Sequence, residues 1–229
     1  MFVARGYLLI SALVVAVIAA PSGQTKSQVP RWHLPCGSTV ETETSAIVNF
    51  NDEVRDSIER LSLLHQLTMT DYLNRDYEFL YERVRIGVHD HQYIPNWVPG
   101  KKDVNLVKGM INAEPQTVSV YCIANYLPKL HMDLQKFAVA FEELMEDETS
   151  PTIFEALRAT QTYLMEMLCE VENIIMDLPP IRLPKRVSRS IMSRTERNPL
   201  DDTRRLIRDW GVLMKYRDYL HAWKHVFNY

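Results

Sequence analysis

Apolar residues recur at steps of three and four along four long stretches of the chain, the pattern of α-helices that bury one face. In the first stretch this period runs from Ile47 to Tyr72, and in the second it continues without a break from Leu127 to Leu144. Period-2 alternation of β-branched residues, the pattern of a half-buried strand, is missing. The sequence therefore predicts an all-α protein with long helices over residues 44–74, 117–146, 152–177 and 202–227.

Prolines and small polar residues refine these boundaries. Pro128 falls inside the second helix and predicts a bend in its first third, because proline lacks the backbone donor. The start of the third helix has two interpretations: Ser150 caps a helix with Pro151 in its first position, or Thr152 and Glu155 form a capping box.

The connections between the four helices are long, short and long. The first has about 40 residues, with a short helix expected around Tyr77 to Val84, and the last has about 20. Only Asp147 to Pro151 separate the second helix from the third, which must therefore run antiparallel, since a helix of about 28 residues is about 42 Å long. The long connections leave room for crossovers, so we expect an up-up-down-down four-helix bundle over residues 44–229.

The beginning of the chain predicts secretion. Arg5 is followed by an apolar run from Tyr7 to Ile18 and by the small-residue cleavage site Val17-Ile18-Ala19. We expect residues 1–19 to be a signal peptide and residues 20–43 to be an N-terminal arm, so that the mature protein is extracellular.

Composition narrows the function classes. A net charge of −3 argues against a nucleic-acid partner. No Gly-x-Ser-x-Gly elbow or other nucleophile setting occurs, and the acids at 142–148 are expected to be solvated charge at a helix end, so we expect no enzyme. His89-Asp90-His91 has no third ligand at a recognisable spacing, and neither a metal nor another cofactor is expected.

Three cysteines allow at most one intrachain disulfide. Antiparallel packing brings Cys122 and Cys169 to the same end of their helices, although each must also face the other. Cys36 lies on the arm and can reach either of them.

The second long connection is strongly basic between Pro184 and Arg197. Lys185-Arg186 is a dibasic pair, and Arg186 with Arg189 has the Arg-x-x-Arg spacing that secretory proteases cut. We expect a solvated crossover loop in an intact chain.

The fourth helix is rich in aromatic and basic residues. Its apolar residues repeat every seven positions and should point inward: Leu206, Leu213, Leu220 and Phe227. These positions are needed to cover the neighbouring helices, so too little apolar face remains for membrane insertion.

Four stretches together resemble a known family. They are TDYLNRD, NYLPKLHMDLQKF, LMEMLCEVENIIMDLPP and DWGVLMKYRDYLHAWKHVF, one from each long helix. They resemble the long-chain helical cytokines of the ciliary neurotrophic factor, cardiotrophin-like cytokine and leukaemia inhibitory factor kind. The resemblance implies a monomeric growth-factor ligand that brings together cell-surface cytokine receptor chains coupled to tyrosine kinases. It also implies a disulfide between Cys36 and Cys169, since the family ties its N-terminal arm to the third helix.

The alternative is a secreted helical carrier of a hydrophobic small molecule, whose helices would enclose a cavity rather than a packed core.

The resemblance also suggests receptor-binding residues. The family uses the helix faces of its first and third helices, and the end of the bundle formed by the start of the last helix and the first crossover. Superposing Trp210-Gly211 on the family's Trp-Gly places Arg205 and Arg208 where the family has phenylalanine and lysine, so the aromatic anchor is missing. Because tyrosine, tryptophan and arginine dominate binding hot spots, the expected patch is Trp97, Arg205, Arg208, Trp210 and Tyr216.

Overall fold

The structure is a computed structural model that describes residues 29–37, 50–85, 94–113, 123–178 and 181–228. Within these ranges every regular element is a helix, which confirms the all-α class for this part of the chain. The expected signal peptide, Cys122 and His89-Asp90-His91 lie outside the described residues. The elements are η1 (Arg31–His33), α1 (Phe50–Asn74), α2 (Tyr77–Leu80), α3 (Glu82–Arg85), α4 (Lys101–Ala113), α6 (Leu127–Asp147), α7 (Pro151–Asp177), η2 (Arg189–Ile191), α8 (Arg194–Arg197) and α9 (Asp202–Phe227).

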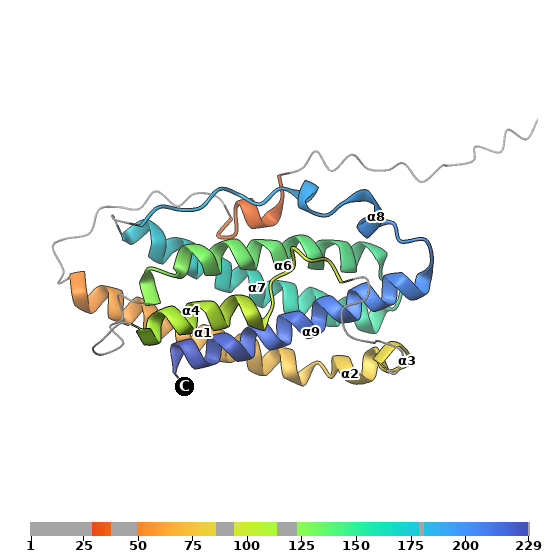
Figure 1. The fold of residues 1–229 in the computed structure, drawn as a ribbon, viewed down its shortest axis with the longest axis horizontal. Helices are drawn as coiled ribbons and strands as arrows, with labels where there is room; N and C mark the ends of the chain where they lie inside the picture. Colours follow the sequence, from red (N-terminus) through yellow and green to blue (C-terminus); the bar gives the residue numbers. More distant parts are fainter. Residues whose placement is uncertain (1–28, 38–49, 86–93, 114–122, 179–180, 229) are drawn as a thin grey trace, which may run out of the picture.

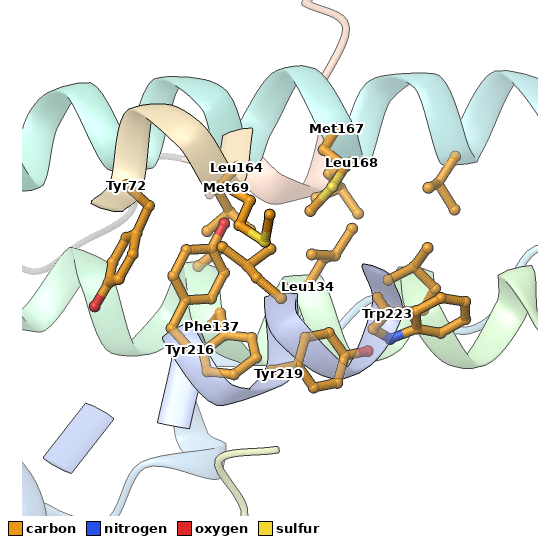
Figure 2. Packing of buried hydrophobic residues seen from close by; sticks show 14 of the residues in the cluster. Met69, Tyr72, Leu134, Phe137, Leu164, Met167, Leu168, Tyr216, Tyr219 and Trp223 are labelled. Carbon is orange, nitrogen blue, oxygen red and sulfur yellow. The ribbon is translucent and has the colours of Figure 1, made fainter. Parts of the chain in front are cut away.

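Four long helices, α1, α6, α7 and α9, pack lengthwise around one core (Figure 1). α7 contacts both α1 and α6, and α9 also contacts both of them. Side chains from all four helices meet between them (Figure 2). The labelled members include Met69 of α1, Leu134 of α6, Leu168 of α7 and Tyr219 of α9.

The helix boundaries follow local sequence signals. α7 begins at Pro151 behind the extended Ser150, which selects that interpretation over a start at Thr152. α6 begins at Leu127, so Pro128 occupies its first turn, where backbone N–H groups have no partner within the helix. The second long helix thus begins at residue 127 and not at the predicted 117, and Pro128 stands at its start instead of bending its first third.

The first long connection contains more helix than the sequence predicts. The short helix expected around Tyr77 is present as α2 and α3, but α4 is a further helix that packs against α9. Its Val104 and Val107 are buried, whereas Leu106 is 64% exposed. α9 therefore has α1, α3, α4 and α6 as neighbours.

The N-terminal arm and the second long connection pack together over the bundle. We call residues 29–37 the arm and residues 181–200 the strap. The strap runs along the outside of α6, with η1 of the arm beneath it (Figure 1). Trp32 of η1 is buried, and its Nε1 donates a hydrogen bond to the Val187 carbonyl of the strap at 2.8 Å. The Sγ atoms of Cys36 and Cys169 lie 2.10 Å apart, so the disulfide that the resemblance implied ties the arm to α7.

Candidate functional site

Arg208 is in the second turn of α9 and is only 1% exposed. Its guanidinium donates hydrogen bonds to the Asp209 carboxylate at 2.8 Å and to the Asp147 carboxylate at 2.7 Å. It also donates to the carbonyls of Glu196 at 2.7 Å and Arg197 at 3.2 Å. Arg208 is thus a buried junction between α9, the end of α6 and the strap.

Arg205 adds a second link at the same place. Its Nη1 donates to the carbonyl of Asp147, the last residue of α6, at 3.2 Å. A cation at the C-terminus of a helix is favourable, because the free carbonyls there carry partial negative charge. Burial raises the pKa of Asp209 to about 6, and Arg208 opposes that rise. The two arginines therefore fasten the start of α9 to the end of α6.

Trp210 and Tyr216 belong to the core. Trp210 is 4% exposed and stacks on Tyr81, with ring centroids 6.0 Å apart. Tyr216 is fully buried, edge-on to Phe137 at 4.9 Å and Phe141 at 5.2 Å.

Three of the five residues that were expected to bind a receptor are buried. The side chains of Arg208, Trp210 and Tyr216 offer no surface to a receptor in this structure. Trp97 and Arg205 are half-buried and retain some exposed surface.

The loop before α4 explains why the first half of α9 is covered. Trp97 donates from Nε1 to Glu196 at 3.2 Å, and Lys215 donates to the carbonyls of Pro95 and Val98 at 3.1 and 2.9 Å. A Cβ on Gly211 would lie 2.3 Å from Cγ1 of Ile94, so only glycine permits this approach. The expected residues do gather around the start of α9, except for Tyr216, but there they pack the loop and strap onto the helix.

Other apolar side chains are exposed at that end of the bundle. α2 and the start of α9 lie at the same end (Figure 1). Exposure reaches 69% for Phe79 in α2, 47% for Leu73 at the end of α1 and 86% for Leu200 just before α9. We call these three residues the bundle-end patch. A hollow of about 180 Å³ beside Leu73 has Tyr72, Tyr77 and Trp210 among its lining residues. Periodicity did not single out Phe79, because a four-residue helix shows no period.

A second exposed apolar pair lies on α1. Leu63 is 59% and Leu67 is 53% exposed, and their spacing of four residues places them on one face. Nearby, Arg60 of α1 approaches Glu170 of α7 at 3.4 Å. The outer face of α1 beside α7 thus combines apolar and charged groups.

The basic strap is tied to the bundle, and the expectation of a solvated loop is wrong. Arg186 makes two hydrogen bonds of 2.5 Å to Glu172 of α7, and Arg189 makes two of 2.7 Å to Glu142 of α6. Arg197 pairs with Glu143 of α6. Two of the acids near the end of α6 that were expected to be solvated, Glu142 and Glu143, are therefore partners of strap arginines.

His131 lies beneath this contact and is fully buried. Its Nε2 is 3.1 Å from Glu172 and 3.3 Å from Arg186, and its Nδ1 is 3.1 Å from Gln135. Burial lowers the pKa of His131, which favours the neutral ring. Burial alone would raise the pKa of Glu172, but hydrogen bonds from Arg186 and His131 outweigh it and leave the pKa below its usual value.

The described part of the chain offers no metal-binding cluster and no membrane-spanning helix. Across the described ranges, no three His, Cys, Asp or Glu side chains converge in a way that could hold a metal ion. None of the described helices has the length and apolar character that a membrane span requires.

No family model, curated protein or solved structure matches the chain.

Proposed function

We propose that the protein is a secreted helical cytokine that binds cell-surface receptor chains and brings them together. The observation that carries this proposal is the course of the long helices in Figure 1, where α1 and α6 run in one direction and α7 and α9 in the other. Together with two long connections and the short link between α6 and α7, this supports an up-up-down-down bundle.

The disulfide is a second support. It joins Cys36 of the arm to Cys169 of α7, the pairing that the resemblance implied. Disulfides persist mainly in oxidising compartments, in line with the signal peptide that the sequence predicts. The expected location is therefore extracellular.

The proposed mechanism is geometric and involves no catalysis by the ligand. A rigid bundle presents two surfaces, the bundle-end patch and the exposed face of α1 around Leu63 and Leu67. Each would engage one receptor chain, so that one monomeric ligand holds two chains together and activates the kinases attached to them.

Phe79 is the proposed anchor of the bundle-end patch. The family's aromatic residue at the start of the last helix is replaced here by Arg205, which is engaged with the end of α6. Phe79 lies at the same end of the bundle and is 69% exposed, so it offers an aromatic side chain to a partner. Aromatic residues, phenylalanine included, are enriched at protein interfaces.

The test is a binding screen of the mature chain against ectodomains of cytokine receptors, followed by Phe79→Ala. We expect at least a tenfold loss of affinity or signalling, about 1.4 kcal/mol, with unchanged helical circular dichroism. Leu106→Ala is the matched control, because Leu106 is 64% exposed on α4, away from the patch, and should leave binding unchanged. Equal binding by Phe79→Ala and the parent would reject Phe79 as an anchor, and failure to bind any receptor would reject the function.

The carrier hypothesis differs in what it requires of the core. The hollow of about 630 Å³ beside the disulfide is lined by Leu34 and Met176, which are 49% and 58% exposed, so it opens at the surface. An enclosed apolar cavity is what a carrier would need. Native mass spectra that show a bound lipid-like molecule would favour the carrier over the cytokine.

A further inference from the structure

The arm and the strap are in direct contact. The arm contains only one three-residue 3-10 turn, too short to be stable alone, and it is held by Trp32 and the disulfide. The strap between 182 and 188 has no regular structure. The Val187 carbonyl accepts a hydrogen bond from Nε1 of Trp32 at 2.8 Å, and the same oxygen lies 3.0 Å from Nε2 of His33. The Arg189 guanidinium lies 5.4 Å from the Trp32 ring centroid, so the arm supports the strap directly.

These contacts cover a segment whose basic residues match the cleavage specificity of endoproteases that cut after lysine or arginine. Lys185 is exposed, but the neighbouring Arg186 is held by Glu172, and the Val187 N–H donates to Gln135 at 3.0 Å. A protease binds its substrate as an extended chain and uses the backbone groups on both sides of the scissile bond. With the backbone N–H and carbonyl of Val187 already paired, the bonds after Lys185 and Arg186 do not fit a protease cleft until the strap lifts.

The disulfide that holds the arm is open to a reductant. Cys36 is exposed, and the hollow of about 630 Å³ is lined by both cysteines. Leu34 and Gly37 of the arm and Asn173 of α7 also line it. The hollow thus gives a small dithiol, or the active-site loop of a thiol oxidoreductase, direct access to the sulfur atoms.

We propose that the Cys36–Cys169 disulfide is a reducible latch that controls proteolytic cleavage of the strap between Lys185 and Arg189. A dithiol supplies two electrons and two protons, the S–S bond becomes two thiols, and the dithiol is oxidised to its own disulfide. The released arm withdraws Trp32 from Val187, and the strap becomes accessible. An endoprotease specific for basic residues then adds water across the peptide bond after Arg186 and leaves a carboxylate on Arg186 and an amino group on Val187. The proposal does not depend on the receptor function, because no receptor takes part in it.

The test is limited proteolysis of the mature chain carrying Cys122→Ser, which removes the third thiol. Trypsin digestion is followed by mass spectrometry with and without dithiothreitol, at a concentration that leaves the helical circular dichroism unchanged. Cleavage after Lys185, Arg186 and Arg189 is compared with cleavage after Lys101 and Lys102, exposed residues in the first turn of α4. We expect reduction to accelerate strap cleavage at least tenfold while the rate in α4 changes less than twofold.

Two variants test the latch without a reductant. Adding Cys36→Ser should reproduce the fast strap cleavage without reductant. Trp32→Ala should also accelerate strap cleavage with the disulfide intact, because it removes the donor to Val187. An unchanged strap rate on reduction would overturn the latch. Equal acceleration in the strap and α4 would also overturn it, since that is the signature of general unfolding.

Discussion

α1 and α9 are almost equal in length, 25 and 26 residues, but they differ in how much of their surface is covered. α1 keeps an outer face on which Leu63 and Leu67 are more than half exposed. α9 is enclosed by α1, α6 and α4, and it buries even Arg208 and Asp209. The comparison shows that neighbours, rather than the polarity of a helix's own residues, decide what it exposes. Matched substitutions in the two helices test this difference.

The largest effect is expected from reversing the buried charge of α9. Arg208→Glu removes the partner of Asp209 and Asp147 and adds a third carboxylate beside them. Breaking a buried ion pair typically costs about 3–5 kcal/mol. Urea unfolding should therefore show that the free energy of unfolding falls by at least this amount. The same substitution at an exposed residue would leave it unchanged.

The matched change on α1 is Arg60→Glu. Arg60 is exposed, and its contact with Glu170 is a surface ion pair worth about 0–1 kcal/mol. If both variants unfold at the urea concentration of the parent, Arg208 is not buried as described, and its role in recognition returns to consideration.

Leucine truncation gives the next contrast. Leu213→Ala in α9 removes a fully buried side chain and should cost about 2–5 kcal/mol. Leu63→Ala in α1 should change stability by no more than about 0.5 kcal/mol, because the side chain is already in water. A cost above about 2 kcal/mol for Leu63→Ala would mean that another surface covers this face of α1 in solution.

The contact between α1 and α9 should also respond to pH. His65 of α1 is buried against Phe227 of α9 and hydrogen-bonds to the backbone of Leu220, and burial lowers its pKa to about 3. Because the unfolded state takes up the proton first, stability is lost as the pH falls below about 6.5, by about 3 kcal/mol at pH 4.

Asp209 acts with the opposite sign, because its raised pKa stabilises the fold in acid and this contribution is lost as the pH rises through about 6. The measurement is therefore the difference between the parent and His65→Gln in urea unfolding at pH 7 and pH 4. The variant should lose about 3 kcal/mol less on acidification. If the free energy of unfolding falls equally in the parent and in His65→Gln between pH 7 and pH 4, His65 is not the source of the acid sensitivity.

Local signals were sufficient to predict that four long helices exist, although the second begins at residue 127 and not at the predicted 117. The predicted ends of the first helix at Asn74 and the last at Phe227 agree with the structure, and Pro151 begins α7. Apolar period and capping residues act within a few positions, so one sequence suffices to locate them. α4 was missed because Pro95, Pro99, Gly100 and Pro115 suggested one long loop, and its two buried valines are too few to define a period.

The candidate site was less predictable. Its position near the start of α9 followed from the resemblance, as did the disulfide. The burial of Arg208 and Trp210 did not, because the strap covers Arg208 and Tyr81, between α2 and α3, stacks on Trp210. No pattern within α9 states which distant segments will cover it. The exposure of Phe79 also depends on distant segments, because none of the described segments covers that side of α2.

The smallest predicted effect tests how closely α9 is covered. Gly211→Ala places a Cβ 2.3 Å from Cγ1 and 2.5 Å from Cδ1 of Ile94, and such overpacking costs about 1–3 kcal/mol, partly offset by a helix-propensity gain of about 1 kcal/mol. We expect a net loss of up to about 2 kcal/mol. In an Ile94→Ala background the same change should become stabilising, because only the propensity gain remains. Gly109→Ala in the exposed part of α4 meets nothing within 4 Å and should stabilise the protein from the outset. If Gly211→Ala and Gly109→Ala shift the urea midpoint equally, the loop at Ile94 does not rest on α9 in solution.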